Sequence, residues 1–149
     1  MAYVAVVGAG SPACTEEQAW LAEEVGAGLA SAGAVVVTGG LGGVMEAASR
    51  GAKSRRGTTL GLLPGHDRRE ANGWVDVAVA TGMGEMRNAL VVRAADAVVA
   101  IGGGPGTLSE IAFALKTGVP VVGLGTFELD GVVVAASAAD AVQRALASV

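Results

Sequence analysis

The most constraining feature of this chain is a set of short runs in which nearly every residue is apolar. The clearest are Tyr3–Val7, Ala34–Val37, Ala97–Ile101 and Val119–Leu124. A strand exposed on one face would alternate apolar with polar residues, whereas these runs are continuous. Continuous apolar runs of this length predict strands of a mostly parallel sheet that is covered on both faces.

Helical segments are expected between these strands, at about 15–31, 44–52, 85–95, 107–117 and 137–148. Further strands are expected at 58–63 and 75–80, and a short VVVA segment follows at 132–135. The sequence TEEQ, Thr15 to Gln18, matches a capping box at a helix start. In the helix after residue 107, the spacing of Leu108, Ile111, Ala112 and Leu115 predicts the buried face. Strand–helix alternation predicts one α/β domain over 1–149, a doubly wound, mostly parallel sheet of six to seven strands flanked by helices.

Composition narrows the classes of function. The net charge of −4 argues against a nucleic-acid-binding surface, which needs a basic excess. No run approaches the roughly 20 apolar residues that a membrane span requires, and the first residues read as a strand and not as a signal peptide. The single cysteine, Cys14, excludes an internal disulfide and fits a reducing compartment. We therefore expect a cytoplasmic protein with no nucleic-acid or membrane partner, and no metal site or cofactor.

Ligands of doubly wound folds bind outside the carboxyl ends of the strands, and three such ends are glycine-rich here. The first, GAGSPA at Gly8–Ala13, contributes Gly8, Gly10 and Ser11 as candidate ligand contacts. It fits a dinucleotide fingerprint superficially, but the acidic residue that would hold a ribose at the end of the second strand is missing. The second junction, TGGLGGVME at 38–46, contributes Gly39, Gly40, Gly43 and Met45.

The third junction, IGGGPGTLSE at 101–110, places glycines between a strand and a helix start. Such a junction presents unpaired backbone N–H groups, and the positive end of the helix dipole favours a phosphate there. No Gly-Lys-Ser/Thr follows, so this is not a triphosphate-binding Walker A loop. We expect Gly103, Gly104, Gly106 and Thr107 to bind a phosphate, although Thr107 is equally suited to capping the helix.

Two charged residues are candidates for chemistry at this edge. Glu110 lies just past the glycine loop, where a carboxylate can complete a helix cap, stabilise an oxocarbenium ion or bind ribose hydroxyls. Arg87 shares a helix face with apolar Val91 and Ala94, and therefore needs an anionic partner. That partner is either a ligand or, more simply, Glu110 in a salt bridge.

These motifs, taken together, resemble those of the Lonely Guy (LOG) family, once described as lysine decarboxylases. GGGPGTLSE resembles its PGGxGTxxE signature, GEMRNALV its Met-x-x-Arg-Lys segment, and GGLGGVMEAASRGA its second glycine-rich loop. The resemblance runs to about Gly125 and is strongest to the bacterial branch similar to molybdenum cofactor carrier proteins. It implies a Rossmann-like fold, a catalytic pair at Arg87 and Glu110, a phosphate cradle at the glycine loop, and a homodimer or higher homo-oligomer.

Two functions follow from the resemblance. The first is a phosphoribohydrolase that releases the base from a nucleoside 5′-monophosphate; Glu46 and Glu85 are weak candidates for activating its water. The second is a carrier or binding protein for molybdenum cofactor or another phosphorylated pterin or nucleotide. The family has Lys where this chain has Asn88, and it has Pro where this chain has Gly102. We expect the phosphoribohydrolase, with the carrier as the alternative; the lost charge at Asn88, itself a candidate ligand contact, puts the cytokinin-specific reaction in doubt and motivates that alternative.

Overall fold

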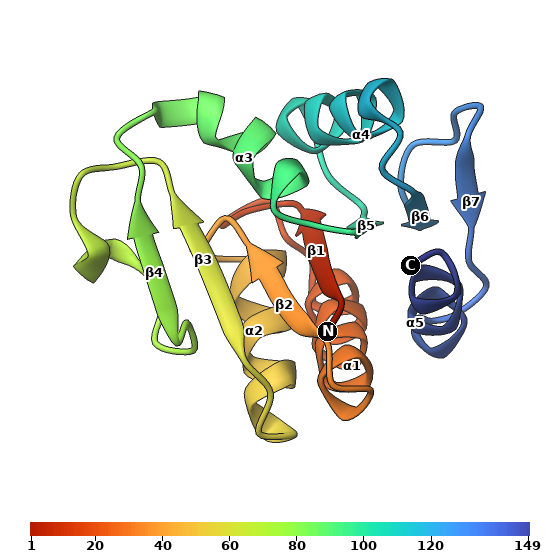
Figure 1. The fold of residues 1–149 in the computed structure, drawn as a ribbon, viewed down its shortest axis with the longest axis horizontal. Coiled ribbons are helices and arrows are strands. Elements are labelled where there is room, and N and C mark those ends of the chain that lie inside the picture. Colours follow the sequence, from red (N-terminus) through yellow and green to blue (C-terminus); the bar gives the residue numbers. More distant parts are fainter.

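The computed structural model describes residues 1–149 and contains a seven-stranded sheet with five α-helices. The strands are β1 (Tyr3–Gly8), β2 (Val35–Thr38), β3 (Thr59–Leu63), β4 (Val77–Ala80), β5 (Ala97–Ile101), β6 (Val121–Leu124) and β7 (Val132–Val134). The helices are α1 (Glu16–Ser31), α2 (Val44–Ser54), α3 (Arg87–Arg93), α4 (Pro105–Thr117) and α5 (Ala138–Ala147). Short 3₁₀ helices, η1 (Arg68–Glu70) and η2 (Gly84–Met86), precede β4 and α3. Figure 1 shows their arrangement.

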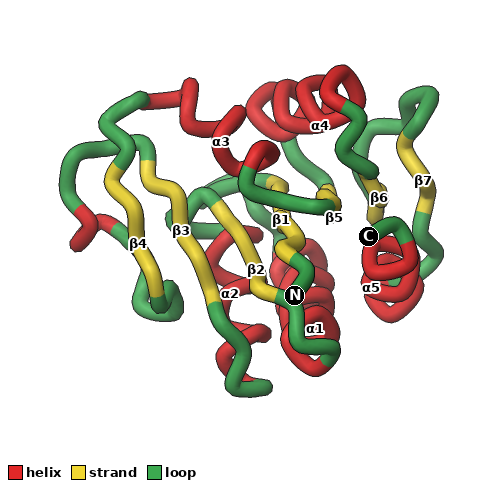
Figure 2. The backbone as a smooth tube through the Cα atoms, in the orientation of Figure 1, coloured by secondary structure: helices red, strands yellow, loops and turns green.

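All strand pairs are parallel, in the order β4-β3-β2-β1-β5-β6-β7. Helices α1, α2 and α5 lie on one face of the sheet, and α3 and α4 on the other (Figures 1 and 2). The strand order reverses beside β1, between β1 and β5, which is where open α/β sheets bind ligands. The expected Rossmann-like, doubly wound fold is confirmed, with seven strands.

The helix termini follow from local chemistry. The Thr15 side chain accepts a hydrogen bond from the Gln18 backbone N–H, and the Gln18 side chain accepts one from Thr15, so the expected capping box starts α1. Gly118 ends α4 in the left-handed conformation, at φ 77°. The helix expected at 85–95 is shorter, because η2 takes up its first turn. None of the helices combines the length and the apolar character that a membrane span requires.

Two expectations about burial were wrong in part. In α4, Ile111 is buried but Ala112 is exposed and Leu108 is 37% exposed; the buried face instead contains Thr107, Glu110, Ile111 and Ala114. The face is rotated because the polar Thr107 and Glu110 point inward, toward the end of the sheet. At the edge strand β4, Val77 and Val79 stay exposed, because α3 is too short to cover them.

Candidate functional site

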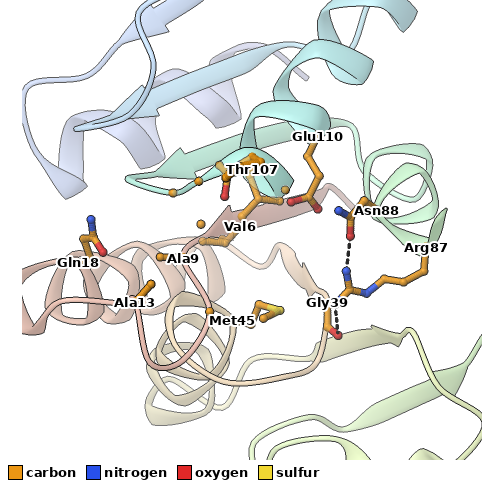
Figure 3. Close-up of a pocket in the computed structure, with 17 residues that line it drawn as sticks. Val6, Ala9, Ala13, Gln18, Gly39, Met45, Arg87, Asn88, Thr107 and Glu110 are labelled. Carbon is orange, nitrogen blue, oxygen red and sulfur yellow. Dashed lines mark hydrogen bonds between the residues drawn. The ribbon is translucent and has the colours of Figure 1, made fainter. Parts of the chain in front are cut away.

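A cavity of about 390 Å³ opens at the carboxyl ends of β1, β2 and β5, within the size range of small-molecule sites. Figure 3 shows it between the N-terminus of α4 and the loops that follow β1 and β2. Eleven of the residues expected from sequence line it: Gly8, Gly10, Gly39, Met45, Arg87, Asn88, Gly103, Gly104, Gly106, Thr107 and Glu110. Four segments that are separated in the sequence, around residues 8–10, 39–45, 87–88 and 103–110, therefore meet at one site.

The N-terminus of α4 supplies hydrogen-bond donors to this cavity. Its first helical bond is from the Leu108 N–H to the Gly104 carbonyl, and its N-cap residue, Gly104, has no side chain to cap it. The backbone N–H groups of Gly103, Gly104, Gly106 and Thr107 have no partner in the protein. Unpaired donors at the positive end of a 13-residue helix suit an anion such as phosphate.

Thr107 adds a side-chain donor beside these amides. Gly103 adopts φ 107°, and a Cβ there would lie 2.3 Å from the Thr107 Oγ1, so only glycine fits against the hydroxyl. The Thr107 hydroxyl makes no hydrogen bond within the protein. It is therefore not the helix cap that the sequence also allowed, and it remains available to a ligand.

Arg87 begins α3 and spans the ends of two strands. Its Nε donates to the Leu62 carbonyl at 2.8 Å. Its Nη2 donates to the Gly39 carbonyl at 3.4 Å, and its Nη1 donates to the Asn88 Oδ1 (Figure 3). Burial lowers the pKa of the guanidinium from its usual value, an effect that the Glu110 carboxylate partly opposes. Arg87 forms no salt bridge with Glu110, so the simpler of its two expected partners is not the one observed.

Glu110 is 9% exposed and is the single carboxylate that lines the cavity. Burial raises the pKa of its side chain to about 7, and the nearby positive charge of Arg87 opposes that rise. At neutral pH the group therefore exchanges between a proton donor and an anion. A carboxyl of this kind can act as a general acid or base, or can donate a hydrogen bond to a ligand oxygen.

Asn88 is oriented by its neighbour. Because its Oδ1 accepts a hydrogen bond from the Arg87 guanidinium, its Nδ2 is turned toward the α4 side of the cavity (Figure 3). A Cβ on Gly106 would lie 3.8 Å from this Nδ2. The position that carries Lys in the LOG family thus offers a neutral donor here.

Three expected contacts lie outside the cavity lining and shape its loops instead. Gly40 is buried, and its N–H donates to the Thr38 hydroxyl at 3.1 Å. Gly43 caps α2 at φ 69°, where a Cβ would lie 2.3 Å from the Ala9 carbonyl oxygen. Ser11 is exposed, with its hydroxyl above Gly42. Their direct contact with a ligand stays a prediction.

Sequence reasoning missed several lining residues, of which Gln18 carries the most chemistry. The others are Val6, Val7, Ala9, Ala13 and Pro105. The capping box drew attention to Gln18 as a helix residue, and its distance along the chain from the junction at 101–110 hid its place beside Gly102. Glu46 and Glu85 do not line the cavity. No group of three His, Cys, Asp or Glu side chains is placed to hold a metal ion.

The chain is similar over most of its length to one protein family and to one further protein. A sequence model of the SLOG cluster4 family matches residues 1–147. An uncharacterized protein of Archaeoglobus fulgidus is 46% identical over 121 residues, which are 81% of this chain and 78% of that protein.

Two solved structures resemble the whole chain. The molybdenum cofactor binding protein from the phototrophic bacterium Rippkaea orientalis is 35% identical, with a TM-score of 0.92 over 98% of this chain and 96% of that one. The molybdenum cofactor carrier protein from Chlamydomonas reinhardtii is 37% identical, with a TM-score of 0.91 over 99% and 97% of the two chains.

Proposed function

The chain belongs to the SLOG cluster4 family, and we propose that it is a binding protein or carrier for a small phosphorylated ligand such as molybdenum cofactor. The observation that carries the proposal is the uncapped N-terminus of α4, which opens on the cavity with unpaired N–H groups. The backbone N–H donors and the positive end of the helix dipole can bind a phosphate without the help of a lysine side chain. The rest of the cavity then holds the pterin or nucleoside part.

The distribution of charge supports binding in preference to turnover. Arg87 is the one cation and Glu110 the one anion of the lining, and three protein acceptors already engage Arg87. No second carboxylate in the lining is available to activate a water molecule. Resemblance to the two cofactor proteins over nearly their whole length points the same way.

A second candidate is the phosphoribohydrolase, and the observation that favours it is Glu110. A buried carboxyl with a pKa of about 7, beside Arg87 and past a phosphate cradle, is suited to glycosidic chemistry. In that reaction the C1′–N bond of a nucleoside 5′-monophosphate breaks and a water oxygen bonds to C1′. One proton of the water goes to the departing base and the other stays on the new C1′ hydroxyl, while ionised Glu110 stabilises the ribosyl cation.

One experiment distinguishes the carrier from the hydrolase. The protein is incubated with a mixture of nucleoside 5′-monophosphates and with molybdenum cofactor released from a molybdoenzyme. Bound ligand is read by native mass spectrometry and free base by chromatography. We expect a phosphorylated ligand bound at one per chain and no release of base. If the unaltered protein releases free base and Glu110→Gln does not, the hydrolase is the function and not the carrier. If the protein binds neither the nucleoside monophosphates nor molybdenum cofactor, both functions are refuted.

Homo-oligomer formation is also proposed. Large apolar side chains stay exposed where β4 and η2 border the sheet, among them Val77, Val79, Met83 and Met86, which are 42–69% exposed. A second copy of the chain that covers this surface would bury it. The stoichiometry stays a prediction.

A further inference from the structure

The two polar atoms of the Gln18 side-chain amide lie in different surroundings. It occupies the third position of α1, where its Oε1 accepts a hydrogen bond from the Thr15 N–H at 3.1 Å. With the oxygen engaged in the capping box, the amide nitrogen is turned the other way. That Nε2 makes no hydrogen bond within the protein, and Gln18 lines the cavity. The cap therefore leaves a free donor beside the site.

Gly102 makes room for this donor. A Cβ on Gly102 would lie 2.2 Å from the Gln18 Nε2, and Gly102 itself adopts φ 55°. Any larger residue would displace the amide. Because Gly102 immediately precedes the unpaired N–H groups of Gly103 and Gly104, the amide sits at the edge of the proposed phosphate cradle. Figure 3 places it at the end of the cavity opposite Arg87.

We propose that the Gln18 side-chain amide donates a hydrogen bond to the phosphate of the bound ligand, with its orientation set by the α1 capping box. This inference rests on the proposed function and adds to it a residue of the phosphate site. The phosphate is then held between the α4 amides and Gln18, by neutral donors from two helices. The organic part of the ligand extends toward Arg87 and Glu110.

The test uses a substitution that keeps the cap and changes the donor. Gln18→Glu keeps a side-chain oxygen as the acceptor for the Thr15 N–H, since Glu serves a capping box as well as Gln does. It replaces the free NH₂ with a negatively charged oxygen facing the phosphate. Thr15→Ala is the matched control, because it weakens the cap and does not alter the amide donor.

Dissociation constants for AMP and for molybdenum cofactor are measured by calorimetry, and Tm without ligand is recorded for each protein. We expect Gln18→Glu to weaken binding by about tenfold or more at an unchanged Tm. Thr15→Ala should lower Tm and leave binding within about twofold.

Binding by Gln18→Glu within about twofold of the unaltered protein would overturn the inference and leave the proposed function standing. Equal weakening in Thr15→Ala would overturn it too, since the effect would then come from the helix end. If the unaltered protein binds neither probe, the proposed function fails and the inference fails with it.

Discussion

Glu110 is the residue whose environment most affects how this protein responds to pH. Its pKa of about 7 in the fold lies above the ordinary value of 4.5 because burial disfavours the charged form. Between these two values the folded state holds a proton that the unfolded chain has lost. The free energy of unfolding therefore falls as pH rises from 4.5 to about 7. At higher pH the native state carries an ionised, buried carboxylate.

We predict that Glu110→Gln removes this pH dependence. The difference between the two pKa values corresponds to about 3 kcal/mol, so the variant should be more stable than the unaltered protein by up to about that amount at pH 8, and by little at pH 4.5. Urea unfolding across this range, in buffers free of phosphate, measures the difference. Groups that titrate in both proteins cancel. A difference that stays constant with pH would show that Glu110 is not the titrating group.

Among single residues, Arg87, Glu110 and Thr107 could be predicted as site residues from the sequence because each lies near a strand end or in a first helical turn. It did not predict that Arg87 bonds to the Gly39 and Leu62 carbonyls in place of Glu110. Those acceptors belong to strand ends far away in the chain, and backbone carbonyls leave no mark in a residue pattern. Gln18 was missed for the same reason, since its neighbour Gly102 lies on another strand–helix junction.

Among the elements, α1 and α2 pack unusually closely. A Cβ on Gly26 of α1 would lie 2.0 Å from the Ala48 carbonyl oxygen, and one on Gly51 of α2 would lie 1.9 Å from the Glu23 carbonyl oxygen. These glycines let the two helix backbones touch. Close packing here fixes α2 against α1, and with it the Gly43 junction that borders the site.

We predict that Gly26→Ala destabilises the protein although alanine is the better helix former. Overpacking against a backbone carbonyl should outweigh the propensity gain of about 1 kcal/mol and lower the free energy of unfolding by about 2 kcal/mol. Gly28→Ala is the control, because its Cβ would lie 2.9 Å from a Val142 methyl group, which a small side-chain shift relieves. Thermal denaturation compares the two, and a Tm for Gly26→Ala at or above that of Gly28→Ala would contradict the packing argument.

Element positions were largely predictable, because strand and helix periods and the Thr15 cap are local signals. β5 was predicted with its observed ends, Ala97 and Ile101. The inner face of α4 was not, since the apolar spacing pointed to Leu108 and Ala112, while burial of polar Thr107 and Glu110 depends on the cavity that they line. Exposure of β4 likewise depends on the short length of α3.

Across the whole molecule, the reversal of strand order beside β1 gathers three glycine-rich junctions into one cavity. Sequence patterns anticipated the parallel sheet and therefore the edge at which these junctions meet. They could not reveal that Gly40, Gly43 and Ser11 would shape the loops without lining the cavity. Within this cavity, we propose that the α4 N-terminus binds the phosphate of the ligand.

Phosphate binding at the α4 N-terminus can be followed in the backbone amide resonances of Gly103, Gly104, Gly106 and Thr107. The ¹⁵N-labelled protein is titrated with the phosphorylated ligand recovered from the binding mixture, and separately with the same ligand after phosphatase treatment. We predict saturable downfield shifts of these four amide protons with the phosphorylated form and none with the dephosphorylated form. Equal shifts with both forms, or saturable shifts of other amides while these four stay unmoved, would show that the α4 N-terminus does not bind the phosphate.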